Sequence, residues 1–168
     1  MFPTRSSRDD IIRGVFTSFD FSLNIQLVCI FCRHGCLPLE EVINVKPLVG
    51  MRVTVQDVLS ALLASEEHAN CIVYQPYPCY VLNFRVYPNS LFVKKRVGLT
   101  TDVLRKYTTM LNGAKSTVVI TTTANGDFRI TFDSIERCLC FWRALDLVPI
   151  KGFFVQARLS ISTLTNKT

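Results

Sequence analysis

The stretch TVVITTTANGDFRITFDSIERCLCFW, Thr117–Trp142, decides more about the fold than any other part of the chain. It begins with a β-branched run, reaches the Asn125-Gly126 pair and continues as an alternating segment over residues 127–132. Asn-Gly between two such segments is the strongest short signal for a β-hairpin. Ser134 follows at the N-cap position of a predicted helix. We expect the inner face of that helix to consist of Ile135, Leu139, Trp142 and Leu145.

The flanking segments extend this pattern in both directions. Upstream, Thr100 or Thr101 can cap a helix that ends at Asn112-Gly113. Before it, alternating residues predict a strand over residues 79–87, and after Pro149 they predict a last strand over residues 153–161.

The N-terminal half adds one helix and one strand. Thr54 and Asp57 have the spacing of a capping box at the start of a helix over residues 55–65. Residues 19–31 alternate between apolar and polar side chains, which predicts a half-buried strand. Residues 1–14 are polar and aperiodic, so we expect a flexible N-terminal arm. The rest predicts one α+β domain over residues 15–168, an antiparallel sheet with about three helices packed on it.

Composition is compatible with a packed domain. The chain has 168 residues, of which 49% are hydrophobic, far from the composition of disordered proteins. No apolar run approaches the roughly 18 residues of a membrane span. We therefore expect a soluble protein that is made in the cytoplasm.

Cysteine and histidine give little support for chemistry. Cys29, Cys32, His34 and Cys36 have the spacing of half a zinc site, but structural zinc needs four convergent ligands. Buried reduced thiols are the alternative that we favour, so we expect no metal and no cofactor. Whether Cys29, Cys32 and Cys36 bind zinc stays open. His34 and His68 are the only histidines, and no catalytic motif surrounds either. We expect no enzymatic activity.

Charge is concentrated in one segment. Between Arg85 and Lys115 there are seven basic residues and one acidic residue, Asp102, whereas the remainder of the chain is neutral. A local excess of this kind indicates an anionic partner, either nucleic acid or an acidic lipid surface.

The candidate site lies inside that segment. Leu91, Phe92 and Val93 follow a turn signal and precede three cations. They are either an exposed apolar wedge for an anionic membrane or a short core strand beside solvated cations. Neighbouring cations on the next helix favour a function, and the same charges would suit a nucleic-acid backbone. The candidate membrane- or nucleic-acid-binding residues are Leu91, Phe92, Val93, Lys94, Lys95, Arg96, Arg105 and Lys106.

Three segments together resemble the matrix proteins of rhabdoviruses, in particular the compact ones of plant rhabdoviruses. Residues 19–31 resemble the first long strand of that family. TVQDVLSALL, Thr54–Leu63, resembles its helix with the pattern T-x-x-D-V-x-x-A, and PCYVLNF, Pro78–Phe84, resembles the next strand. A looser likeness covers FDSIER and GFFVQARLSI near the C-terminus.

This resemblance implies a viral structural protein. Such a protein would self-associate as a homo-oligomer, condense the viral nucleoprotein–RNA and tether it to an anionic membrane, as a peripheral protein of the virion and host cytoplasm. The family also has an exposed apolar loop after the strand that Pro78–Phe84 resembles, and that loop would fall on Leu91–Val93. The arm lacks a Lys-rich run and a P-P-x-Y motif, so a budding function is not implied.

A second resemblance competes with the first. The predicted order strand, helix, hairpin, helix, strand over residues 79–161 is similar to a ferredoxin-like nucleic-acid-binding domain. The ITFDS stretch, Ile130–Ser134, resembles the dimeric papillomavirus E2 DNA-binding domain. This E2-like alternative implies a dimeric regulator that binds nucleic acid.

Overall fold

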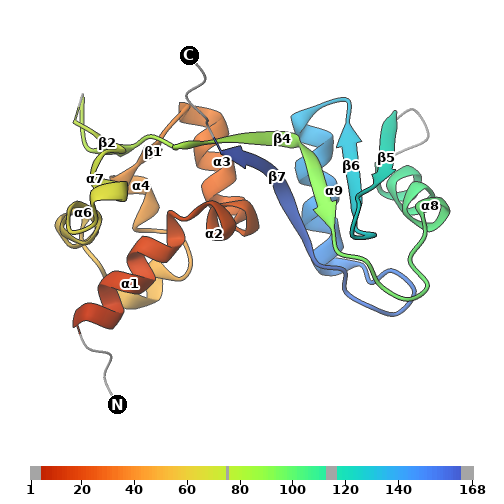
Figure 1. Cartoon of the computed structure of the whole chain (residues 1–168), viewed down its shortest axis with the longest axis horizontal. Helices are drawn as coiled ribbons and strands as arrows, with labels where there is room; N and C mark the ends of the chain where they lie inside the picture. The colour runs from red at the N-terminus through yellow and green to blue at the C-terminus, as the bar shows by residue number, and fades with distance from the viewer. Residues whose placement is uncertain (1–4, 75, 113–116, 164–168) are drawn as a thin grey trace. The chain divides into compact units, whose positions relative to one another are not determined.

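The computed structural model describes residues 5–74, 76–112 and 117–163, and it confirms the α+β class. Helices accompany two antiparallel sheets, one of three strands and one of four. Within the chain, contacts form two compact units. The first comprises residues 1–85 with 163–168, and the second comprises residues 86–162. The two units have different architectures (Figure 1).

The first unit is mainly helical. Its short strands β1 (Leu37–Pro38), β2 (Ile72–Val73) and β3 (Cys79–Tyr80) form an antiparallel sheet of order β1-β3-β2. A helix, a strand, further helices and a hairpin that pairs back onto the first strand make up the topology of a winged helix. The helices are α1 (Arg5–Val15), α2 (Ser18–Leu23), α3 (Ile25–His34), α4 (Leu39–Val42), α5 (Leu48–Met51), α6 (Val55–Leu63) and α7 (Glu66–Ala69).

The expectation of a flexible arm is wrong for residues 5–14, which belong to helix α1. Ile12 and Val15 are buried, and the Arg8 and Arg13 guanidinium groups donate to backbone carbonyls of Met51 and Ala61. The apolar stripe of this helix is narrow, so its sequence reads as polar although one side packs. Residues 1–4 lie outside the described part of the chain.

The predicted strand over residues 19–31 is also wrong, because this segment forms α2 and α3. The Asn24 side chain separates the two helices, since it accepts hydrogen bonds from the Gln26 and Leu27 backbone amides at 3.0 and 3.2 Å. Phe19, part of the alternating pattern, is 58% exposed, whereas Leu27 and its neighbour Val28 are both buried. The apolar and polar residues of these two short helices alternate by chance, and this alternation resembles the pattern of a strand.

The helix predicted over residues 55–65 is confirmed as α6. Its capping box is formed in both directions: the Thr54 amide donates to Asp57 Oδ2 at 2.9 Å, and the Asp57 amide donates to Thr54 Oγ1 at 3.1 Å. The strand predicted over residues 79–87 is instead divided between two sheets, as β3 and as the start of β4 (Phe84–Val93).

The second unit has the order β4, α8 (Thr101–Asn112), β5 (Val118–Thr122), β6 (Phe128–Phe132), α9 (Ile135–Leu147), β7 (Ala157–Thr163). Its antiparallel sheet has the strand order β5-β6-β4-β7 (Figure 1). A βαββαβ chain with this strand order has ferredoxin-like topology. The second of the two sequence resemblances therefore describes the topology of this unit.

The predicted hairpin and caps of this unit are confirmed. β5 and β6 pair across the Asn125-Gly126 turn, where Gly126 has a φ of 89°. Ser134 Oγ accepts from the Arg137 amide at 3.2 Å and so caps α9. Thr100 Oγ1 accepts from the Val103 amide at 3.2 Å and caps α8. Gly113 lies outside the described residues.

One face of the four-stranded sheet packs against the helices. Leu91, Val93 and Ile130 from the strands are fully buried, as is Leu104 from α8. The ring of Phe132 lies 5.4 Å from that of Phe141 on α9. The opposite face of the sheet carries no helix from the described residues of this unit (Figure 1), and we call it the helix-free face. None of the helices in the described part of the chain has the length and hydropathy of a membrane span.

Candidate nucleic-acid interface

The predicted apolar wedge is wrong. Leu91 and Val93 are fully buried in β4, where they pair with Ile130 and Phe128 of β6. The core-strand alternative therefore applies to both. Successive side chains of a strand point to opposite faces, so Phe92 lies on the helix-free face, where it is half-buried.

Lys94, Lys95 and Arg96 follow β4 directly and are exposed, as the sequence predicts. Lys95 is tied to the β5–β6 turn: its amide donates to Asp127 Oδ1 at 2.9 Å, and its Nζ donates to the Asn125 carbonyl at 2.6 Å. This end of the sheet is therefore basic, with Asp127 partly offsetting the charge.

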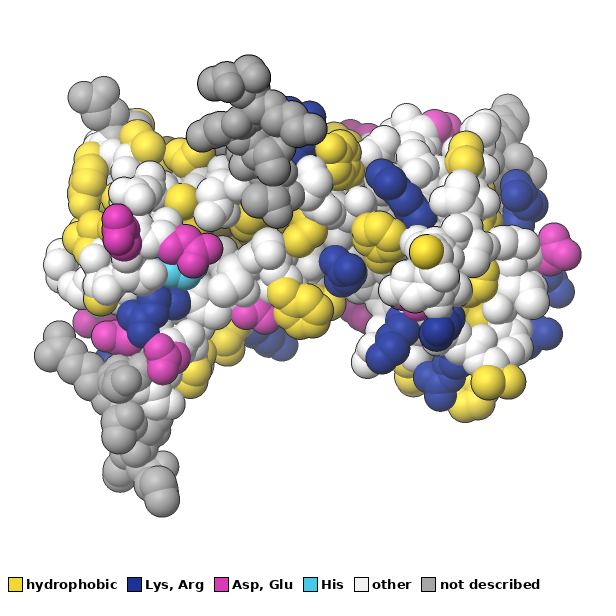
Figure 2. All heavy atoms as spheres, in the orientation of Figure 1, with side chains coloured by type: hydrophobic (Ala, Val, Ile, Leu, Met, Phe, Trp, Pro, Cys, Tyr) yellow, Lys and Arg dark blue, Asp and Glu magenta, His cyan; other side chains and the backbone are white. Residues whose placement is uncertain are grey.

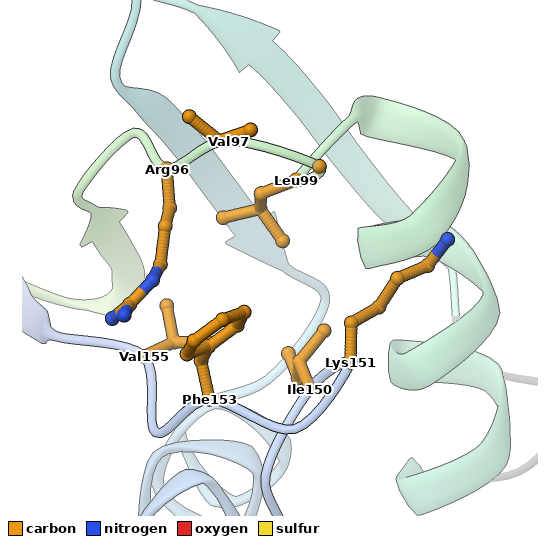
Figure 3. A pocket seen from close by; sticks show the side chains of 8 residues that line it. Arg96, Val97, Leu99, Ile150, Lys151, Phe153 and Val155 are labelled. Carbon is orange, nitrogen blue, oxygen red and sulfur yellow. The ribbon is translucent and has the colours of Figure 1, made fainter.

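Arg96 adopts a different arrangement. Its guanidinium carbon lies 4.0 Å from the centre of the Phe153 ring, a cation–π contact (Figure 3). Leu99 and Ile150 complete a shallow apolar notch beside this ring. The notch encloses only about 10 Å³, room for a single water molecule at most, so it is not a ligand pocket.

Arg105 and Lys106 are exposed on α8. This helix turns Leu104 and Thr108 inward and packs on the sheet from the helix side. The structure therefore does not bring these two cations to the helix-free face together with Phe92.

The helix-free face carries cations that sequence reasoning missed. Arg129 on β6 is the direct register partner of Phe92, and its guanidinium carbon lies 5.9 Å from the centre of the Phe92 ring. Arg158 on β7 approaches the same ring to 5.2 Å. Because β4 lies between β6 and β7, the side chains form a row across three strands. We call Arg158, Phe92 and Arg129 the Arg–Phe–Arg row.

The two arginines of this row lack carboxylate partners within residues 5–74, 76–112 and 117–163. Arg129 Nε is shielded from solvent and has no hydrogen-bond acceptor among them. A shielded donor without an acceptor costs roughly 1–3 kcal/mol. Beside the row, the hydroxyls of Ser90 and Thr131 are 3.0 Å apart and hydrogen-bonded. The row is therefore a cationic aromatic surface with uncompensated charge.

The two units differ in net charge. Residues 86–162 contain eleven Lys and Arg against five Asp and Glu, a net charge of +6. The first unit contains eight of each and is neutral. Figure 2 shows the dark-blue basic side chains concentrated over the part of the molecule that contains β4–β7.

A sequence signal for the row exists. Arg129 occupies a polar position of the alternating segment FRITF, and Arg158 occupies the equivalent position in ARLSI. Cations at the outward positions of strands in one sheet gather on one sheet face. The charge count over Arg85–Lys115 followed the linear sequence and could not include them.

The prediction of buried thiols is wrong for Cys32, which is exposed, and Cys29 and Cys36 are only partly buried. Cys29 and Cys32 lie on α3, and Cys36 lies just before β1. Burial and a hydrogen bond with Cys36 raise the pKa of the Cys79 thiol to about 11, which keeps it protonated at neutral pH. In the part of the chain that the structure describes, no group of three or more His, Cys, Asp or Glu side chains is placed to hold a metal.

Comparison with known proteins adds no family. No protein-family model matches the chain, and no curated protein matches it.

Proposed function

We propose that this protein binds single-stranded nucleic acid through the helix-free face of residues 86–162. The observation that carries the proposal is the Arg–Phe–Arg row. An aromatic ring on a sheet gives a base a stacking platform, and flanking guanidinium groups hold phosphates or stack on further bases.

The dimensions of the row favour a single strand. Neighbouring strands lie about 4.8 Å apart, so the row spans about 10 Å across β6, β4 and β7. The major groove of a duplex admits a helix or a two-stranded ribbon, and the four-stranded sheet is wider than that, whereas an unpaired base can lie flat on Phe92. Lys94 and Lys95, in the basic loop at the end of the sheet, supply further positive charges for the phosphate backbone of the bound strand.

Both topologies agree with this proposal by analogy. Ferredoxin-like sheets and winged helices recur among nucleic-acid-binding proteins, although neither fold by itself implies a function. The net charge of +6 on the second unit supplies the salt-dependent attraction that any nucleic-acid binder needs.

The test is fluorescence anisotropy with labelled 12-nucleotide RNA, the DNA of the same sequence, and the corresponding duplex. We expect both single strands to bind more tightly than the duplex at equal salt. Replacing Phe92 with alanine should weaken single-strand binding about 5- to 150-fold, the equivalent of the roughly 1–3 kcal/mol of one stacked base.

Two controls sharpen this test. Phe19→Ala removes an aromatic side chain that is 58% exposed in the first unit, and it should leave the affinity unchanged. Lys106→Ala removes a cation from the helix side of the sheet and should have little effect. Unchanged affinity in Phe92→Ala, or a preference for duplex that is lost in Lys106→Ala, would refute the helix-free face as the site. The second result would favour the E2-like alternative, in which α8 enters a groove.

The matrix function remains a second proposal, because the end of the second unit is both basic and apolar. Val97 is 97% exposed next to Arg96, and Phe154 is 60% exposed in the loop before β7. Exposed apolar side chains beside cations are typical of proteins that bind anionic membranes. Flotation with phosphatidylserine vesicles tests it, and a chain that stays unbound at low salt would rule it out.

A further inference from the structure

The first unit contains a cavity that the proposed function does not use. It has a volume of about 180 Å³ and lies where the α1–α2 junction, α7 and the segment after β3 meet. Its apolar wall is formed by the rings of Phe16, Tyr80 and Phe84, all of which are buried. The centres of the Phe16 and Tyr80 rings lie 4.6 Å apart, so the two rings pack against each other.

A buried histidine supplies the polar side of this cavity. His68 is only 6% exposed, and its Nδ1 is hydrogen-bonded to the Tyr80 hydroxyl at 2.9 Å. Nε2 is the remaining polar atom of the ring, and it has no hydrogen-bond partner among the described residues. It is not shielded from solvent, and His68 lines the cavity.

Two further groups on the cavity wall have unused hydrogen-bonding capacity. The Asn83 amide and the Ser18 hydroxyl line the cavity, and within the described residues neither side chain has a hydrogen bond. Glu67 also lines the cavity. The cavity therefore combines flat apolar walls with at least one donor and several acceptors.

These groups restrict the chemistry of a ligand. Among the described residues no lysine or arginine lines the cavity. The nearby cation Arg13 is already ion-paired with Asp10, and Glu67 would repel a phosphate. A purely aliphatic ligand would leave the polar groups without partners at a cost. A small, neutral, planar ring with donors and acceptors on its edge satisfies both requirements, and nucleobases have this chemistry.

We propose that the cavity lined by Phe84, His68 and Asn83 binds one nucleobase. The base would rest against the apolar wall, and its edge would meet Nε2 of His68 and the Asn83 amide. This site lies entirely in the first unit and shares no residue with the Arg–Phe–Arg row, so the two proposals stand independently.

The experiment uses the full chain with Phe92→Ala, which removes the stacking ring of the other site. Titration with adenosine, cytidine and uridine, followed by ¹H–¹⁵N spectra, should give saturable shifts in the low-millimolar range for at least one nucleoside. The shifts should be centred on residues 16–18, 67, 68 and 83. Ribose alone should give none.

Variants decide whether the cavity is the site. Asn83→Ala should weaken binding of the preferred nucleoside about tenfold, the loss of one hydrogen bond. Asn83→Phe should fill the opening and abolish saturation. Asn44→Ala, an exposed asparagine elsewhere in the unit, is the matched control and should bind normally. Equal shifts in all three variants, no saturation with any nucleoside, or a response to ribose alone would each overturn the proposal.

Discussion

The two units differ in whether their arginines form ion pairs. In the first unit Arg8, Arg13 and Arg33 form ion pairs with Asp57, Asp10 and Glu41. In the second unit Arg137 pairs with Asp133, whereas both arginines of the Arg–Phe–Arg row lack a carboxylate partner in the described part of the chain. A cation that a protein leaves uncompensated on a sheet face is available to a ligand. Arg129 and Arg158 therefore differ from Arg8, Arg13 and Arg33 in that no carboxylate of the described residues compensates their charge.

The largest effect should come from the two hydrophobic cores. Leu62 of the first unit and Leu91 of the second are both fully buried. Each change to alanine should lower the free energy of unfolding by about 2–5 kcal/mol through lost burial and a cavity. Trp142, the single tryptophan, lies in the second unit and reports on that unit in urea unfolding. We expect Leu91→Ala to shift the Trp142 fluorescence midpoint more than Leu62→Ala does. Equal shifts would mean that the units unfold as one.

A smaller effect should separate the cations of the two units. Arg129→Gln with Arg158→Gln should reduce the slope of log affinity against log salt by about 1.4, if each contacts one phosphate of a single strand. The matched control is Arg8→Gln with Arg33→Gln, which removes two ion-paired arginines of the first unit and should leave the slope unaltered. Anisotropy at four salt concentrations measures this slope. Parallel lines for the wild type and Arg129→Gln/Arg158→Gln would exclude phosphate contacts by the row.

The smallest effect concerns pH and the first unit. Burial lowers the pKa of His68 below its ordinary value of 6.5, Arg13 adds to this, and the Glu67 carboxylate opposes it. The unfolded chain therefore takes up a proton at a higher pH than the folded chain does. The contribution of neutral His68 to stability is complete above about pH 6.5 and declines as the pH falls below it.

Urea unfolding at pH 7.5 and pH 5.0 measures this decline. We expect the wild type to lose more stability between these values than His68→Gln, because the variant has no imidazole to protonate. A wild type with the same pH dependence as the variant would contradict a lowered pKa.

The sequence predicted the second unit better than the first. Asn125-Gly126, Ser134 and Thr100 are local signals, and each formed the turn or cap that it specifies. In the first unit the elements are short, and four of the described helices have six residues or fewer. A helix of this length is too short to show the 3.6-residue hydrophobic period by which a helix is recognised in a sequence.

For the site, the sequence located part of the charge and misjudged the apolar residues. Lys94, Lys95 and Arg96 are exposed as predicted, because burying three adjacent cations would cost far more free energy than leaving them in water. The wedge was one of two alternatives for Leu91 and Val93, and it depended on the turn that Pro88, Asn89 and Ser90 indicate. These three residues instead belong to β4. Pairing with β6 overrode the local turn preference.

The sequence by itself thus determined the α+β class, the Asn125-Gly126 hairpin, the helix caps and the presence of a local basic excess, because each depends on residues close together in the chain. Tertiary structure alone decided which residues form the site. Phe92, Arg129 and Arg158 are far apart in sequence and meet only because β4 lies between β6 and β7. Strand order is a long-range property of packing, so no local pattern could place a phenylalanine between those two arginines.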